Sequence, residues 1–249
     1  MIDERSENAI YKLIIEDQLR SPEGRFCPFR REKQMDYLFS HLRRDFDQAG
    51  QKVLDMCGGY GRLTYFLNEL DSRQEYYCFD SSETLIALAR DKFAGNRNIH
   101  CEVADLYLLT PQFEKKFDVT VNYKTLSYLP YYEQAIAQLV KATRKKVYIT
   151  SQFFDGDVDF ISRIYERTSE RREERYSYLN CYAVPRFVDY CHSLGVRKVE
   201  FEDMRLDIDL DPPADRNELK TYTIQTRDQG RLEVNGVVIL NWKLAILTL

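Results

Sequence analysis

Three carboxylates and a group of glycines are the residues whose types and spacing suit the binding of a charged, hydroxylated ligand. Asp55 lies in an apolar stretch that breaks into a turn with glycines at 58, 59 and 61. Glycine permits a positive φ and leaves the backbone bare, so a ligand can lie against it. Asp80 and Asp105 each end a later apolar stretch, and Asp80 follows the last glycine by 19 residues. In a doubly wound sheet, an acid at the position of Asp80 can accept hydrogen bonds from both hydroxyls of a ribose.

The glycine turn lies between a predicted strand and a predicted helix. The run from Lys52 to Arg62 begins as an apolar strand, and the apolar residues 63, 66, 67 and 70 recur at helical spacing. The first N–H groups of a helix have no partner within it and favour an anion. This turn therefore suits a ligand that carries a carboxylate or another negative group.

The spacing of the glycines excludes two common nucleotide sites. A dinucleotide site has a Gly-x-Gly-x-x-Gly pattern, but the third glycine position, counted from Gly59 and Gly61, is Thr64. A phosphate loop ends in Gly-Lys-Ser/Thr, and here Arg62 and Leu63 follow the glycine. Neither NAD nor ATP is indicated.

The remaining pattern, Asp-x-x-Gly-Gly-x-Gly, resembles the first motif of class I S-adenosylmethionine (SAM) dependent methyltransferases. That motif is usually Asp-x-Gly-x-Gly-x-Gly, and Cys57 stands at its first glycine. The departure indicates either a slightly different turn or a small side chain tolerated beside the cofactor. The resemblance extends over residues 52–153, because acids also end the second and third predicted strands and Asp118 begins the fourth.

Five predicted strands alternate with helices, which predicts a parallel sheet with helices on both faces. The first starts at Lys52, and the others span residues 75–80, 98–105, 117–123 and 146–153. Helices are predicted over 83–93, from about 130 to 143 and over 184–193, with Ser82 as an N-cap. Two helices are predicted before the first strand. The resemblance implies that the first of them, with Tyr11 and the loop around Arg25, covers the cofactor as a lid. The alternative is a helix that only packs against the core.

The resemblance implies the rest of the fold and the roles of the site residues. Residues 197–209 and 242–249 would close the sheet as an antiparallel hairpin. The expected fold is an α/β, doubly wound, Rossmann-like sheet of seven strands in one domain, with a helical cap (1–50), a SAM-binding core (52–153) and a substrate-side segment (154–249). Asp80 is expected to bind the ribose, Asp105 the adenine amino group and Leu106 the adenine ring. The full set of expected SAM-binding residues is Asp55, Cys57, Gly58, Gly59, Gly61, Asp80, Ser81, Asp105, Leu106 and Asn122.

The substrate-side segment carries several polar patterns. Residues 157–179 are predicted as a helix whose charged residues form a solvated face; the alternative is an arginine that holds a substrate phosphate or carboxylate. Tyr176, Tyr178, Asn180 and Tyr182 suit a hydroxylated ligand or form packing contacts. Residues 207–211 are predicted as a strand with three acids on one face, which favours a solvated edge over a metal site.

The C-terminal part predicts an extra hairpin and a subfamily. Strands are predicted over 221–227 and 231–234, joined by a turn at residues 228–230. The Thr-Tyr-Thr, Arg-Leu-x-x-x-Gly and Asn-Trp patterns of this region are similar to those of methyltransferases associated with surface carbohydrates. The implied acceptor is a hydroxylated small molecule, such as a sugar or a nucleotide sugar.

Ligands of open parallel sheets bind beyond the carboxyl ends of the strands, which sorts the candidates for a catalytic base. His100 opens the third strand, and His41 and His192 lie on helices that lead away from that edge. No histidine is therefore predicted to act as the base. The groups that follow the fourth and fifth strands remain, and of these we predict Asp155 or Tyr128.

Composition limits the other partners. The chain has 249 residues, 40 acids and 36 bases, for a net charge of −4, which disfavours RNA and other polyanions. The six cysteines form no Cys-x-x-Cys pair, so no zinc ribbon is indicated.

There is neither a signal-like N-terminus nor a membrane-length apolar run, so we expect a cytoplasmic protein. A protein or RNA methyltransferase and a non-catalytic SAM-binding protein remain as alternatives.

Overall fold

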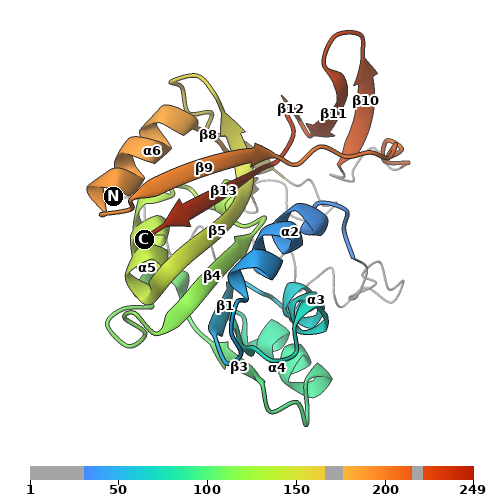
Figure 1. The fold of residues 1–249 in the computed structure, drawn as a ribbon. Helices are drawn as coiled ribbons and strands as arrows, with labels where there is room; N and C mark the ends of the chain where they lie inside the picture. Colours follow the sequence, from blue (N-terminus) through green and yellow to red (C-terminus); the bar gives the residue numbers. More distant parts are fainter. Residues whose placement is uncertain (1–30, 166–175, 215–220) are drawn as a thin grey trace.

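The computed structural model describes residues 31–165, 176–214 and 221–249, and its main element is one mixed sheet (Figure 1). Seven strands lie side by side in the order β3-β2-β1-β4-β5-β13-β9. Their bounds are Lys52–Met56 for β1, Glu75–Asp80 for β2, Ile99–Val103 for β3, Phe117–Tyr123 for β4, Thr143–Phe154 for β5, Lys198–Asp203 for β9 and Lys243–Thr248 for β13. Strands β1 to β5 are parallel, and β13 runs antiparallel between β5 and β9. The predicted seven-strand sheet and its closing hairpin are confirmed, and a short strand β8 (Cys181–Ala183) additionally pairs with the end of β5.

Helices cover both faces of this sheet (Figure 1). Helices α5 (Glu133–Ala142) and α6 (Val184–Ser193) share one apolar cluster with the sheet. Helices α2 (Met35–Asp45), α3 (Arg62–Leu70) and α4 (Glu83–Lys92) share the cluster on the opposite face. Apolar residues at helical spacing put one stripe of each helix into the core. The parallel strands consequently end along a single edge, where connecting loops carry polar residues.

A second sheet is inserted between β9 and β13. It consists of β10 (Tyr222–Thr226), β11 (Gly230–Asn235) and β12 (Val238–Ile239), and it projects from the main body in Figure 1. The predicted strands 221–227 and 231–234 are confirmed. Gly230 adopts a φ of +72° where β11 leaves the turn, a conformation that favours glycine.

Two predictions for the substrate-side segment were wrong. Residues 157–179 do not form one helix: within the described residues, β6 (Arg163–Tyr165) and β7 (Tyr176–Tyr178) form an antiparallel pair. The Tyr165 and Tyr176 rings contact each other across this pair at a tilt, with centroids 5.7 Å apart, and such aromatic cross-strand pairs favour strands over a helix. Several of the charged residues expected on that helix, including Arg167 and Arg171, lie outside the described part, as do Tyr11 and Arg25.

Residues 207–211 are not a strand either. Only Leu210 bonds to β10, through both its N–H and its carbonyl with Thr223. The side chain of Asp209 instead accepts a hydrogen bond from Arg231 Nε at 2.8 Å. Among the described residues no group of three His, Cys, Asp or Glu side chains is arranged to hold a metal. A search of the same residues also finds no helix with the length and apolar character of a membrane span.

Candidate active site

The predicted glycine turn connects β1 to α3 and is organised around Asp55. The Asp55 side chain is buried and accepts a hydrogen bond from the Thr64 hydroxyl at 2.7 Å. Burial raises the pKa of Asp55 to about 6, although the hydrogen bonds from Thr64 act in the opposite direction. Thr64, which breaks the dinucleotide pattern, thus fixes the acid of the turn.

The glycines of the turn have different physical roles. A Cβ on Gly58 would lie 2.8 Å from both Asp55 Oδ2 and Cys78 Sγ. Gly61 has a φ of +86°, and a Cβ there would lie 2.4 Å from the Phe93 ring. Gly59 has a φ of +59°, but the nearest atom to its hypothetical Cβ is 3.8 Å away, on Leu85. Gly58 and Gly61 allow close packing, whereas Gly59 leaves bare backbone beside open space.

Cys57 occupies a glycine-like conformation in the same turn. Its φ is +64°, in the left-handed region that non-glycine residues rarely adopt. Burial and the nearby carboxylates of Asp80, Asp55 and Asp105 raise the pKa of its thiol well above the usual value, whereas a hydrogen bond with Asn122 lowers it. The turn therefore holds a small neutral side chain in a conformation that glycine adopts without strain.

Asp80 lies at the carboxyl end of β2, directly beside the turn. Its Oδ2 accepts a hydrogen bond from the Gly59 N–H at 3.0 Å, and its Oδ1 accepts one from the Ser82 N–H at 2.9 Å. The Ser82 hydroxyl in turn accepts a bond from the Leu85 N–H and caps α4, as predicted. Ser81 is exposed between them. The structure thus places the predicted ribose carboxylate next to the bare backbone.

The remaining predicted cofactor residues follow β3 and end β4. Asp105 Oδ1 accepts a hydrogen bond from the Tyr107 N–H at 2.8 Å, and Leu106 is buried after it. Asn122 is buried and donates from Nδ2 to the Met56 carbonyl at 3.0 Å. All the predicted SAM-binding residues lie at the carboxyl edge of β1 to β4. Their contacts with SAM remain a prediction.

A partly buried ion cluster at this edge was not foreseen in the sequence. Glu32 accepts hydrogen bonds from Lys124 Nζ at 2.7 Å and from the Tyr123 hydroxyl at 2.9 Å, and it lies 2.5 Å from Arg62. Burial alone would raise the pKa of Glu32, but Lys124 and Arg62 outweigh it and lower the pKa to about 2. Glu32 precedes α2 far from the others in sequence, so no spacing pattern could have indicated this cluster.

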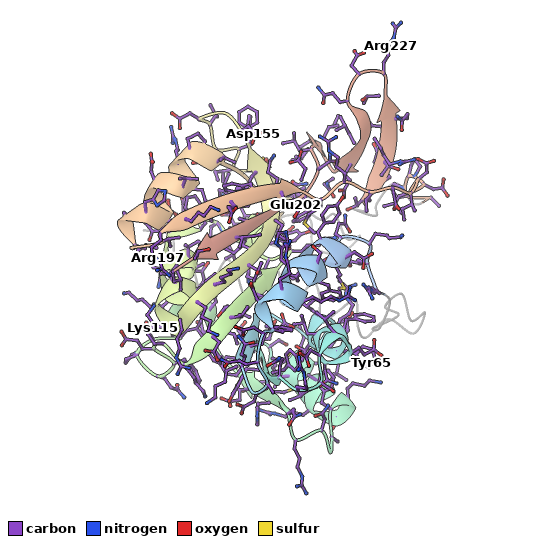
Figure 2. All side chains as sticks on the ribbon, in the orientation of Figure 1. Tyr65, Lys115, Asp155, Arg197, Glu202 and Arg227 are labelled. Carbon is purple, nitrogen blue, oxygen red and sulfur yellow. The ribbon has the colours of Figure 1, made fainter. Side chains whose placement is uncertain are left out.

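A polar cleft of about 650 Å³ lies at the carboxyl ends of β5 and β9, beneath the inserted sheet. Its charged and amide side chains are Asp155, Asp203, Arg205, Asp228, Gln229, Asn241 and Lys243. Lys243 Nζ lies 3.3 Å from an Asp155 oxygen and 2.6 Å from Asp203 Oδ1. Asp155 follows the last residue of β5 and is labelled in Figure 2. Its side chain is 79% exposed.

Tyr128, the other predicted base, occupies a different environment. It ends a 3-10 turn (Leu126–Tyr128) after β4 and packs against the α2 side of the core. Burial, with a smaller effect of Glu32, raises the pKa of Tyr128 to about 12. Its hydroxyl is therefore protonated at neutral pH.

The three histidines contact other parts of the molecule. His100 lies 3.0 Å from Glu75 at the start of β2, which is the opposite edge of the sheet. His41 pairs with Glu202 on the outer strand β9, and His192 bonds the Val196 carbonyl. None of them lines the polar cleft. That no histidine acts as the base remains a prediction.

Comparison with known families decides the class of this site. Residues 53–146, which run from β1 into β5, match the model of a methyltransferase domain. The chain carries a SAM-dependent methyltransferase domain. SAM is its cofactor, as the glycine turn predicted. No curated protein matches the sequence significantly.

Solved structures with the same fold are distant in sequence. A protein in complex with the Haloferax volcanii Trm112 methyltransferase activator has a TM-score of 0.58 at 13% identity, over 87% of this chain and 88% of that one. The YcgJ protein of Bacillus subtilis has a TM-score of 0.54 at 9% identity, over 86% and 97%. The CMeT domain of the citrinin polyketide synthase has a TM-score of 0.50 at 14% identity, over 80% of this chain and 46% of that one. This methyltransferase therefore spans about half the length of that last chain, and at these identities the likeness shows the fold alone.

Proposed function

We propose that this methyltransferase transfers a methyl group from SAM to a hydroxylated small molecule of the sugar or nucleotide-sugar kind. The observation that carries the proposal is the polar cleft beyond β5 and β9, whose charged and amide side chains suit hydroxyl groups. It lies on the same edge of the sheet as the glycine turn, where ligands of open α/β sheets bind. Its carboxylates also disfavour a nucleic acid acceptor.

The residues present suit the cofactor. Gly59 leaves backbone open for the amino-acid end of SAM, and the start of α3 offers N–H groups for its carboxylate. In this proposal, Asp80 accepts hydrogen bonds from the ribose hydroxyls, and Asp105 and Leu106 contact the adenine. When bound, SAM supplies an activated methyl group on a sulfonium sulfur. The chain's own task is to hold the acceptor oxygen in line with that methyl and to remove its proton.

Asp155 and Tyr128 are the sequence-predicted bases. Asp155 lines the cleft, but it is mostly exposed and ion-paired with Lys243, which suits binding of an acceptor hydroxyl. Tyr128, with its raised pKa, supplies few phenolates at neutral pH. We retain Asp155 as an acceptor contact of the proposed reaction.

A labelled-methyl assay tests the proposal. The protein is incubated with SAM that carries a radioactive methyl group and with cell lysate separated by size. Label should enter molecules of low mass, and S-adenosylhomocysteine (SAH) should bind with submillimolar affinity in calorimetry. Label that enters only protein or RNA would contradict the acceptor class. Absence of both SAH binding and transfer would contradict the enzymatic function.

A further inference from the structure

Cys78 and Cys101 form a pair of thiols beneath the glycine turn. They are register partners on the adjacent parallel strands β2 and β3, and both are free cysteines. Both side chains pack in the apolar cluster on the α3 and α4 face of the sheet, and the two thiols share a hydrogen bond. Neighbouring strands lie about 4.8 Å apart, which is within the Cα separation that a disulfide bridges. The two sulfur atoms can therefore be joined with little movement of the strands.

Cys101 is the member of the pair that a small oxidant can reach. It is partly exposed on β3, the strand at the end of the sheet, whereas Cys78 has no exposed surface. The hydrogen bond from the Cys78 thiol and the nearby Arg90 guanidinium lower the pKa of the Cys101 thiol, although partial burial raises it. The same hydrogen bond, together with burial, raises the pKa of Cys78. The pair thus combines an accessible thiol that favours its thiolate with a buried partner that keeps its proton.

The other cysteines of the described residues lack these properties. Cys57 and Cys191 pack with the apolar cluster on the opposite face of the sheet. Burial raises the pKa of Cys181 and of Cys191 to about 12, and the pKa of Cys57 is also raised. Among the cysteines that the structure describes, Cys101 alone has a lowered thiol pKa. An oxidant should therefore react first at Cys101.

The sulfur of Cys78 supports the glycine turn directly. It lies 3.9 Å from the Gly59 carbonyl oxygen, and a Cβ on Gly58 would lie 2.8 Å from it. The Gly58 N–H also donates to the carbonyl of Phe79, the residue after Cys78. Protein interiors are close-packed, so a displaced core atom changes the support of its neighbours. A Cys78 sulfur drawn toward β3 would therefore alter the turn that SAM is proposed to contact.

We propose that Cys78 and Cys101 form a reversible disulfide that lowers the affinity of the glycine turn for SAM. The effect on affinity rests on the proposed function, which places SAM at this turn. The oxidant is a peroxide. The Cys101 thiolate attacks one peroxide oxygen, so that a sulfur–oxygen bond forms, the oxygen–oxygen bond breaks and hydroxide leaves.

The buried cysteine completes the disulfide. The Cys78 sulfur attacks the Cys101 sulfur, the sulfur–oxygen bond breaks, and the hydroxyl group leaves as water with the Cys78 proton. The two thiols together lose two electrons, which reduce the peroxide, and a dithiol reductant reverses the reaction.

The test measures SAH affinity by calorimetry for the full chain in two states, reduced with dithiothreitol and oxidised with hydrogen peroxide. Mass spectrometry of the proteolysed protein identifies which cysteines are joined. For the wild type we expect a disulfide between Cys78 and Cys101 and SAH binding about 10-fold weaker than in the reduced state, within the usual range of coupling between sites. Dithiothreitol should restore the affinity.

Variants separate this disulfide from other oxidation. Cys101→Ala and Cys101→Ser both remove the accessible thiol, at a partly exposed position that lies outside the predicted cofactor residues. Each should bind SAH as the reduced wild type does and should keep that affinity in peroxide. Cys191→Ala, which removes a buried thiol from the opposite face, is the matched control and should lose affinity in peroxide as the wild type does.

Three results would overturn the inference while the reduced wild type still binds SAH. Peroxide could join other cysteines or none, the disulfide between Cys78 and Cys101 could leave SAH affinity unchanged, or both Cys101 variants could still lose affinity in peroxide. In these cases the proposed cofactor site stands. A reduced wild type that binds no SAH would instead overturn both the inference and the proposed binding of SAM at this turn.

Discussion

At the scale of single residues, the site depends on side chains that hold the turn as well as on those predicted to meet the cofactor. Asp80 bonds the Gly59 N–H and therefore helps to fix the backbone that SAM would contact. Cys57 keeps a left-handed conformation that a glycine would adopt without strain.

Asp80→Ala should weaken SAH binding by more than about 1 kcal/mol, because hydrogen bonds to a charged group are lost. Calorimetry with the wild type and with Asp91→Ala, an exposed position of α4, gives the comparison. Unchanged affinity in Asp80→Ala would show that this acid does not hold the ribose.

Glu32 predicts a pH dependence of stability. Its pKa is lowered from 4.5 to about 2 in the folded protein, so the unfolded chain binds more protons between these values. The stabilisation, up to about 3 kcal/mol, is present above about pH 4.5 and is lost as pH falls toward 2. Urea unfolding from pH 3 to 7 should show this slope for the wild type and a weaker one for Glu32→Gln.

The exposed Glu114→Gln variant should keep the wild-type slope and serves as the control. Equal slopes in Glu32→Gln and the wild type would mean that the pairs with Arg62 and Lys124 do not form in solution.

At the scale of elements, the sequence predicted what local pattern determines. Apolar runs that end on acids located β2 and β3, and the glycine turn located the start of α3. Residues 157–179 were mispredicted because the spacing of their charged residues matches a helix. In the structure, residues 163–165 (β6) and 176–178 (β7) instead pair as antiparallel strands. Glu32, Gln34 and Glu233 were missed because their contacts span up to 199 residues, a separation that no local pattern records.

The turn itself predicts a contrast between two glycine variants. Gly61→Ala should destabilise the fold by more than about 2 kcal/mol for two reasons. The φ of +86° at this position is strained for alanine, and the added Cβ would lie 2.4 Å from the buried Phe93 ring. Gly59→Ala has no neighbour within 3.8 Å and should cost about 1 kcal/mol, but its methyl would occupy the cofactor side. Thermal unfolding and SAH calorimetry separate the two effects.

If Gly59→Ala kept wild-type affinity for SAH, the bare backbone at this position would not be the cofactor contact. If Gly61→Ala were as stable as Gly59→Ala, the close packing of the turn against α4 would be wrong.

At the scale of the whole molecule, the parallel core and the C-terminal additions contribute different candidate site residues. Strands β1 to β4 end in the predicted cofactor residues, and β5, β9 and the inserted sheet surround the polar cleft. The insertion between β9 and β13, drawn in Figure 1, contributes residues to that cleft. Its strand β11 also carries Glu233. We therefore expect the ends of β1 to β4 to bind the cofactor and the cleft beneath the inserted sheet to bind the acceptor.

The most direct measurement is a crystal structure of the full chain with SAH bound. We predict that its amino-acid end lies against the backbone at Gly59, its ribose hydroxyls bond the Asp80 carboxylate, and its sulfur faces the region between β4 and the inserted sheet. SAH bound elsewhere, or side chains filling the space beside Gly59 and Asp80, would contradict the account.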